Sequence, residues 1–267
     1  MMRPQSVEEI LERKHSNSEE CEQSLSDLRC AVAIGLEVPK KCRGRVWKLF
    51  LRLRDVSATC YIGLVHRGPS TFDQKIRSDT GRTLKTDMDF VEHVSVDMLI
   101  RVLNAFVWIS RQDGRANATS EELQLQDQFR KGSVCKELTY VQGMNVILAP
   151  FLRVMPEMEA FYAFSTFVWR VCPLYVQPTL RGVHCGARLV DLCLRELDPE
   201  LYGYLSAKEL TAKTYAFKYI MTFSACRPPL SQVLLLWDVM LAVGAHLNVL
   251  FIVAQLSLIR SQLMQSP

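Results

Sequence analysis

The apolar residues of this 267-residue chain recur at helical spacing. The clearest stripe lies between Ser95 and Ser110, and its members are Val96, Leu99, Ile100, Leu103, Phe106 and Val107. Side chains three and four residues apart share one face of an α-helix, so this stripe predicts an amphipathic helix packed on a core. No segment shows the sustained apolar–polar alternation or the Asn-Gly turns that are typical of strands and hairpins. The chain is therefore predicted to be all-α, with about a dozen helices.

Start and stop signals divide the chain further. Ser6 and Glu9 have capping-box spacing, and Gly35 is a plausible end for a helix over 18–34. Other helices are expected over 46–51, 160–171, 186–197, 207–223, 231–243 and 247–264. Two polar segments interrupt this pattern. We expect 68–89 to be mostly loop with a helical turn, and 111–136 to be a surface excursion between two helices.

Composition narrows the class of protein. Hydrophobic residues make up 49% and charged residues 22%, which is typical of a globular chain. The net charge of +4 is too small to indicate a nucleic-acid partner. Nine cysteines occur singly, with no C-x-x-C pair, so the sequence does not support a zinc or thioredoxin-like site. Free thiols and the polar N-terminus, which lacks a signal peptide, favour a reducing cytoplasm.

One stretch passes a crude test for a membrane span, because residues 239–259 contain no charged side chain. However, Gly244, His246, Asn248 and Gln255 interrupt it. A break between two buried helices explains this pattern better than a transmembrane helix.

A polar stretch, Tyr140–Asn145, stands directly before an apolar run. Glutamine is rarely buried, and Gly143 beside it lets another backbone or a ligand come close. The stretch is either the mouth of a binding site or a helix start with a surface Gln142. These six residues alone leave both interpretations open.

A second polar element contains Asp79 and Arg82, three residues apart. Asp79 could hold Arg82 so that its guanidinium faces a partner. Spacing alone favours a simpler interpretation, an exposed ion pair on one helical turn worth less than about 1 kcal/mol.

Three short blocks in order resemble the signature of the TBC domain, a family of GTPase-activating proteins for Rab-type small GTPases. They are Arg43-Gly44-Arg45-Val46-Trp47, Ile76-x-x-Asp79-x-x-Arg82 and Tyr140-x-Gln142-Gly143-Met144. Further likeness in 140–156, 182–184, 198–202 and 228–238 points to the mitotic-exit and septation checkpoint branch. That branch restrains a Ras-like GTPase and typically works with a scaffold partner.

The resemblance implies a role for each matched residue. Arg82 would be an arginine finger that stabilises charge on the transferring phosphoryl group, and Gln142 would orient the attacking water. Asp79 would fix the arginine, while Tyr140 and Asn145 would support the glutamine loop.

Three more residues follow from the same resemblance. Gly143 would let the partner's switch loop approach, whereas Arg43 and Trp47 would be structural. No cofactor is expected in this chain, because GTP and magnesium would belong to the partner GTPase.

The resemblance also implies an architecture of two packed helical lobes. Residues 1–38 would be a helical lead and 39–267 the TBC domain, whose last lobe would be incomplete at residue 267. We expect a cytoplasmic protein, with the spindle pole, the centrosome or a membrane reached through partners.

Two features favour an alternative, a module that binds a GTPase without accelerating hydrolysis. Gly81 stands where the family leads us to expect a bulky residue, and the chain ends early. A generic helical adaptor would require the motif matches to be accidental. A hydrolase is not supported, because neither a catalytic triad nor a phosphate-binding glycine loop is recognisable.

Overall fold

The computed structural model describes residues 6–13, 17–53, 56–111, 118–135 and 137–266. The described residues form seventeen α-helices and two short irregular helices, and they contain no strand. The first ten are α1 (Val7–Leu11), α2 (Ser18–Ala33), α3 (Lys40–Phe50), α4 (Ala58–His66), α5 (Asp73–Thr80), α6 (Met88–His93), α7 (Val96–Ser110), α8 (Ser120–Arg130), α9 (Met144–Val154) and α10 (Glu157–Thr166). The all-α prediction is confirmed.

The second half begins with two short irregular helices, η2 (Phe167–Val171) and η3 (Pro173–Tyr175). The remaining helices are α11 (Arg181–Leu197), α12 (Pro199–Ala207), α13 (Ala212–Tyr215), α14 (Phe217–Met221), α15 (Leu230–Val243), α16 (Leu247–Leu258) and α17 (Arg260–Met264). The helix expected over 207–223 is split into α13 and α14, and similar breaks raise the count above a dozen.

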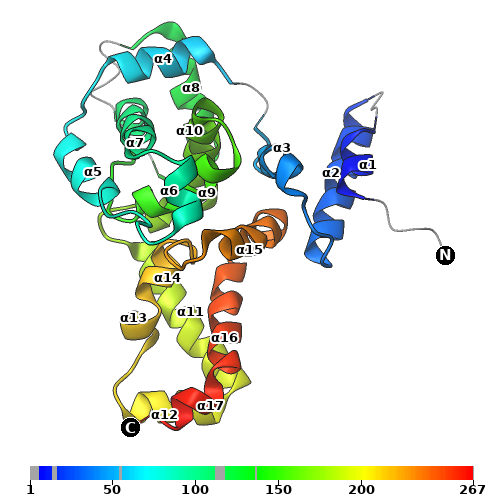
Figure 1. Ribbon diagram of the computed structural model, residues 1–267, viewed down its shortest axis with the longest axis vertical. Helices are drawn as coiled ribbons and strands as arrows, with labels where there is room; N and C mark the ends of the chain where they lie inside the picture. Colours follow the sequence, from blue (N-terminus) through cyan, green and yellow to red (C-terminus); the bar gives the residue numbers. More distant parts are fainter. Residues whose placement is uncertain (1–5, 14–16, 54–55, 112–117, 136, 267) are drawn as a thin grey trace.

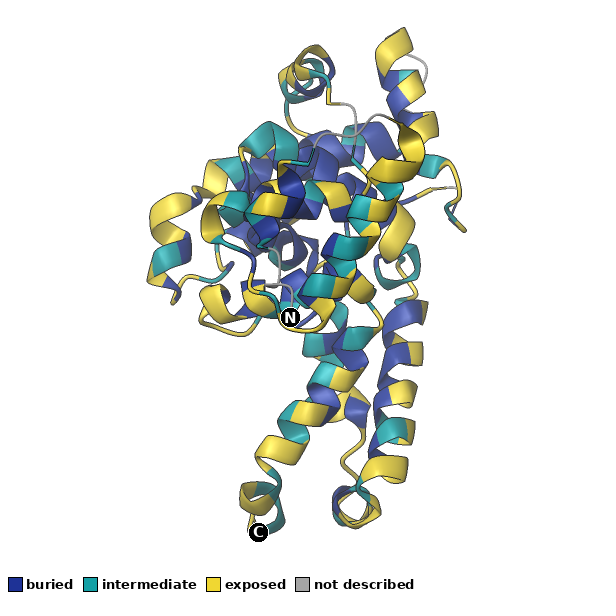
Figure 2. Ribbon diagram, turned by 90° about the vertical axis from the view of Figure 1, so that its right-hand side faces the viewer, coloured by how far each residue is buried: buried dark blue, intermediate teal, exposed yellow. Residues whose placement is uncertain are grey.

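The helices pack as two lobes (Figure 1). Helices α4–α10 form the larger lobe, and α11–α14, α16 and α17 form the smaller one, with α15 at their junction. Each lobe has its own cluster of buried apolar side chains. Buried residues fill the larger lobe, whereas in the smaller lobe they form a narrower stripe along long helices (Figure 2). The predicted two-lobed architecture is confirmed.

Aromatic rings join α3, α9 and α15 in the larger core. Trp47 stacks on Trp237 with ring centroids 5.7 Å apart, and Phe151 meets both rings edge-on. Such pairs each add roughly 0.5–1.5 kcal/mol beyond the area they bury. Trp47 is therefore a core anchor in this structure.

A buried ion pair reinforces the same junction. Arg43 Nε donates to both carboxylate oxygens of Asp238 at 3.0 Å, and Trp47 Nε1 donates to Oδ1 at 2.6 Å. Burial raises the pKa of Asp238 to about 6, although these donors act in the opposite direction. Arg43 and Trp47 thus tie α3 to α15 in the interior.

The N-terminal helices lie against this junction. The capping box between Ser6 and Glu9 is present, and Gly35 follows α2 with a φ of +106°. Arg29 of α2 donates to the carbonyls of Leu241 and Ala242 at the end of α15. The boundary at residue 38 stays a prediction.

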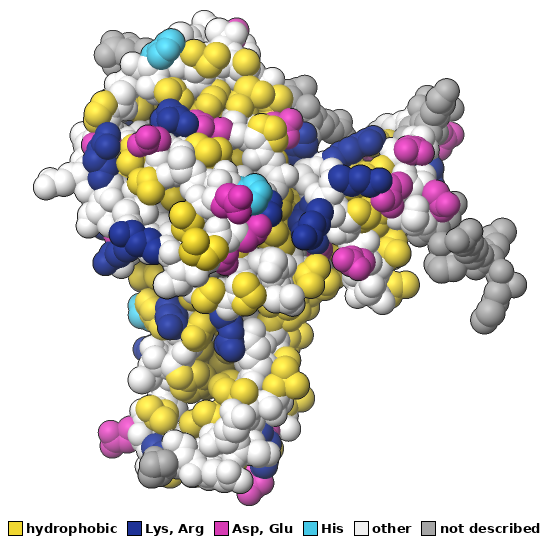
Figure 3. Space-filling model, in the orientation of Figure 1, with side chains coloured by type: hydrophobic (Ala, Val, Ile, Leu, Met, Phe, Trp, Pro, Cys, Tyr) yellow, Lys and Arg dark blue, Asp and Glu magenta, His cyan; other side chains and the backbone are white. Residues whose placement is uncertain are grey.

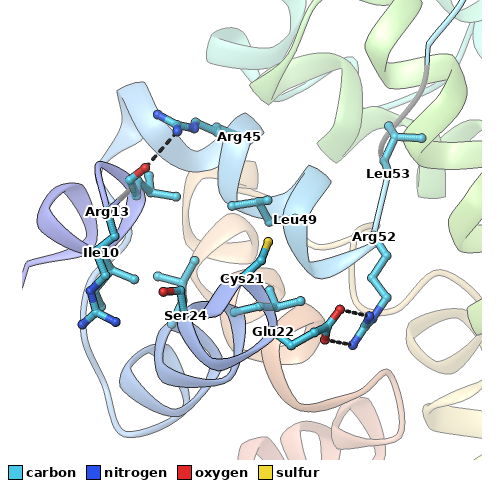
Figure 4. A pocket seen from close by; sticks show the side chains of 12 residues that line it. Ile10, Arg13, Cys21, Glu22, Ser24, Arg45, Leu49, Arg52 and Leu53 are labelled. Atoms are coloured by element: carbon cyan, nitrogen blue, oxygen red, sulfur yellow. Dashed lines mark hydrogen bonds and ion pairs between the residues drawn. The ribbon is translucent and has the colours of Figure 1, made fainter. Parts of the chain in front are cut away.

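A groove of about 260 Å³ lies between α1, α2 and α3 (Figure 4). Ile10, Cys21 and Leu49 are among its apolar lining, and Arg52 closes one end through a bidentate pair with Glu22.

The segment 111–136 differs from its prediction as a surface excursion. It contains α8, which a capping box between Thr119 and Glu122 begins. Phe129 is buried against Phe161, and Gln126 Nε2 donates to the carbonyl of Ile109 near the end of α7. The few apolar residues conceal the helical period, and the capping-box spacing of Thr119 and Glu122 is a local signal that the sequence analysis did not use. Residues 112–117 and 136 lie outside the described part.

Two smaller expectations also change. Residues 73–80 of the expected loop form α5, and Val96 of the predicted stripe is exposed at the start of α7. Within the described residues, no helix is both long and apolar enough to cross a membrane.

Candidate functional site

The first half of the site is the turn that follows α5. Ile76 anchors α5 in the core, and the Thr80 hydroxyl donates to the Ile76 carbonyl at the end of the helix. Gly81 adopts an ordinary helical conformation with a φ of −58°, and its N–H donates to the Arg77 carbonyl. The backbone before Arg82 is therefore held in place and does not use the conformational freedom of glycine.

Arg82 reaches solvent from a buried base. Its side chain is 61% exposed, whereas that of Asp79 is 4% exposed. Arg82 Nη2 donates to Asp79 Oδ1, and Tyr140 Oη donates to Asp79 Oδ2 at 2.9 Å. Burial and the Asp79 carboxylate raise the pKa of Tyr140, so its hydroxyl remains a donor at neutral pH. Both carboxylate oxygens of Asp79 are thus engaged.

The second half is the loop before α9. Gly143 has a φ of +101°, a conformation that favours glycine, and Met221 lies 3.1 Å from where its Cβ would be. The Gly143 N–H donates to Asn145 Oδ1 at 3.1 Å. Gln142 precedes this turn with an exposed side chain.

Asn145 connects the two halves. Its Nδ2 donates to Thr83 Oγ1 at 2.8 Å and to the Asp79 carbonyl at 3.3 Å. Thr83 Oγ1 in turn donates to the same carbonyl at 3.0 Å. All three residues are buried, so the turn that carries Arg82 and the loop that carries Gln142 form one hydrogen-bonded unit.

Thr83 is a site residue that the sequence analysis did not single out. It directly follows Arg82, and a small hydroxyl residue beside a candidate finger is the signal that could have identified it.

An open hollow of about 390 Å³ adjoins both halves. We define it by its lining: the turn after α5, the loop before α9, helix α14 and the segment that follows α14. Arg82, Gln142, Lys85 and Lys218 all line it, and Lys218 comes from the smaller lobe. Lysine and arginine side chains are visible near the junction of the lobes on the face in Figure 3. Partners of this site would meet both lobes.

Comparisons with known proteins bear on the same segments. Residues 132–264 match the family model described as the Rab-GTPase-TBC domain. Cell division control protein 16 of Schizosaccharomyces pombe is 42% identical over 226 residues, covering 84% of this chain and 67% of that protein. The chain belongs to the TBC domain family.

Two further relatives carry related names. The mitotic check point protein BUB2 of Saccharomyces cerevisiae is 39% identical, over 91% of this chain and 78% of its own length. A putative mitotic check point protein BUB2 of Dictyostelium discoideum is 38% identical over 85% of this chain, which spans 56% of that relative.

Solved TBC domains share the fold. The Chlamydomonas flagellar RabGAP TBC domain superposes with a TM-score of 0.68 at 18% identity, covering 96% of this chain and 77% of that one. The Ypt/Rab-GAP domain of Gyp1p gives a TM-score of 0.65 at 17% identity, covering 91% and 82%.

In this TBC domain, five of the eight predicted motif residues line the hollow: Asp79, Arg82, Gln142, Gly143 and Asn145. Tyr140 lies beneath them, in contact with Asp79. Arg43 and Trp47 are elsewhere, in the core between α3 and α15. Chemically, the hollow presents a permanently charged donor and a neutral amide, each on a supported backbone and accessible from outside.

Proposed function

We propose that this TBC domain is a GTPase-activating protein that inserts Arg82 and Gln142 into the active site of a Rab-like or Ras-like small GTPase. One observation carries the proposal. Two exposed polar side chains, sixty residues apart in sequence, line a single open hollow and stand on one buried hydrogen-bonded unit. If Asp79 and Arg82 were only a surface ion pair, and Gln142 only marked a helix start, the two segments would not share one buried hydrogen-bonded unit.

The chemistry assigns one task to each side chain. Negative charge develops on the phosphoryl oxygens during GTP hydrolysis, and an arginine supplied in trans can add about 10³ to 10⁵ in rate. This corresponds to about 4–7 kcal/mol of activation barrier. Gln142 carries both a donor and an acceptor, which is what positioning a neutral water requires. GTP and magnesium would be supplied by the partner.

The pairing of Arg82 with Asp79 is compatible with this task. The guanidinium is 61% exposed, so it remains accessible to phosphate oxygens while it is paired with Asp79. Asp79 itself remains held by Tyr140. It therefore aims the arginine without trapping it.

The names of the relatives suggest a process. They are called cell division control and mitotic check point proteins. We propose a GTPase in mitotic exit or septation as the partner, together with a scaffold subunit, in the cytoplasm or at the spindle pole.

A second candidate is a module that binds a GTPase without accelerating it. The observation in its favour is that Arg82 is already engaged by a buried carboxylate. A partner that failed to displace Asp79 would bind without gaining the finger.

Single-turnover GTP hydrolysis on a panel of Rab-like and mitotic-exit GTPases separates the two candidates. We expect acceleration of at least one member, with Arg82→Ala losing about 10³-fold and Gln142→Ala losing a substantial part. Arg77→Ala is a matched control, because Arg77 lies on α5 just before the turn that carries Arg82, is 55% exposed and pairs with Asp73.

Equal rates for wild type and Arg82→Ala on an accelerated GTPase would refute the finger mechanism. Nucleotide-dependent binding without acceleration of any panel member would favour the second candidate.

A further inference from the structure

Two lysines flank the proposed fingers from different lobes. Lys85 belongs to the turn after Arg82, and Lys218 belongs to α14 in the smaller lobe. Both line the hollow and both are exposed. We call this pair the basic rim.

The charge of the hollow is unbalanced. Among the described residues that line it, Asp79 is the one carboxylate, and it is buried and already bonded to Arg82 and Tyr140. The ion pairs of the described part include neither Lys85 nor Lys218. The ammonium group of Lys218 contacts the Tyr219 ring at 4.9 Å. The cations of the rim are therefore available to a partner.

Hydrogen bonds hold the backbone of α14 and of the segment that follows it. The Lys218 carbonyl accepts from the Thr222 hydroxyl at 2.7 Å. Two non-glycine residues just beyond α14, Phe223 and Ser224, have positive φ angles of 50° and 61°. Buried hydrogen bonds retain them: Trp237 Nε1 donates to the Phe223 carbonyl, and the Ser224 hydroxyl donates to Asn248. Strained backbone that is held in this way often marks functional segments.

We propose that the basic rim binds carboxylates on the surface of the GTPase partner, so that both lobes take part in its recognition. This inference rests on the proposed function, since it assumes that a GTPase docks at the hollow. A lysine ammonium is a compact, hydrated charge suited to exposed contacts, whereas the planar fork of Arg82 suits phosphate oxygens. The fingers would thus meet the nucleotide while the rim meets the protein around it. Rim charges act chiefly on the association rate and its salt dependence.

The test uses the full chain with Lys85→Glu, Lys218→Glu and the double variant. Lys131→Glu is the control, because Lys131 is an exposed lysine at the end of α8, outside the hollow, and changes the net charge equally. Association rates are measured against panel GTPases loaded with a non-hydrolysable GTP analogue, at several salt concentrations. Hydrolysis is measured in parallel as kcat and KM.

We expect each rim variant to associate roughly threefold to tenfold more slowly at low salt, with the difference vanishing at high salt. KM should rise more than kcat falls, and the control should match wild type. Unchanged melting temperatures would show that the exposed substitutions leave the fold intact.

Rim variants that associate at the wild-type rate would overturn the proposal, even where Arg82→Ala abolishes acceleration. A loss confined to kcat would also overturn it, because it would place Lys218 on the nucleotide. Rim-dependent binding without acceleration would support the rim while refuting the finger mechanism.

Discussion

The hydrogen bond from Tyr140 to Asp79 is the most informative single contact to remove. Tyr140→Phe deletes one hydroxyl and leaves the ring in place, so no cavity larger than an oxygen atom forms. The bond is 2.9 Å long, and both residues are buried. Hydrogen bonds to charged groups contribute roughly 1.5–3 kcal/mol. We expect the free energy of unfolding to fall by about 2 kcal/mol.

Tyr162→Phe provides a neutral comparison. Tyr162 is equally buried, but its hydroxyl donates to the Ser57 carbonyl at 2.8 Å and accepts from the Ser57 N–H. Removing these two bonds between neutral groups should cost about 1 kcal/mol for each bond, against about 2 kcal/mol for the single bond of Tyr140 to a charged group. Urea denaturation of both variants measures the loss of stability for each hydrogen bond, and the loss at Tyr140 should shrink when Asp79→Asn removes the charge.

The same substitution tests how Arg82 is supported. Without the Tyr140 hydroxyl, Asp79 Oδ2 loses its hydrogen-bond donor, and the carboxylate can rotate together with the Arg82 side chain. GTPase acceleration should then fall several-fold, far less than in Arg82→Ala. A Tyr140→Phe loss that is no larger than the loss for each bond in Tyr162→Phe, and that stays the same when Asp79→Asn is present, would refute the idea that a buried carboxylate carries the arginine.

Three other predictions concern glycines and a buried acid. Gly143→Ala should cost about 1–2 kcal/mol of unfolding free energy, because its φ is +101°, and should slow GTPase acceleration; denaturation and single-turnover assays measure both. Gly182→Ala should lower the free energy of unfolding by about 1–3 kcal/mol, because its Cβ would lie 2.5 Å from the Tyr175 ring. Gly203→Ala has open space around it in α12 and should raise the free energy of unfolding by up to about 1 kcal/mol. Equal melting temperatures for the two variants would contradict this pair of predictions. Asp238 has a folded pKa of about 6 against 3.8 ordinarily, so the folded state binds its proton more tightly. The stability of wild type relative to Asp238→Asn should therefore fall by about 2 kcal/mol between pH 4 and pH 7. A stability difference that stays constant or rises with pH would show that the Arg43 ion pair affects the pKa of Asp238 more than burial does.

Local signals predicted the helices whose apolar faces are continuous. The stripe before Ser110 and the capping box at Ser6 are sufficient for α7 and α1, because helix period and capping involve residues a few positions apart. Helix α8 escaped detection because its few apolar residues show no clear period, although the capping-box spacing of Thr119 and Glu122 was available; its buried Phe129 packs against distant aromatic rings. The break between α13 and α14 likewise depends on packing against α11 and α16.

For the site, the sequence by itself determined which residue types stand where: an acid three residues before Arg82, and a glycine directly after Gln142. Spacing alone could not distinguish an exposed ion pair from a supported arginine, because that distinction depends on whether Asp79 is buried. Only the tertiary structure decided it, by placing Tyr140 and Asn145 against α5 from sixty residues away. The tertiary structure also brought Lys218 of the smaller lobe to the hollow that Arg82 lines. No local pattern encodes either contact, since both depend on how the two lobes and their buried hydrogen bonds pack.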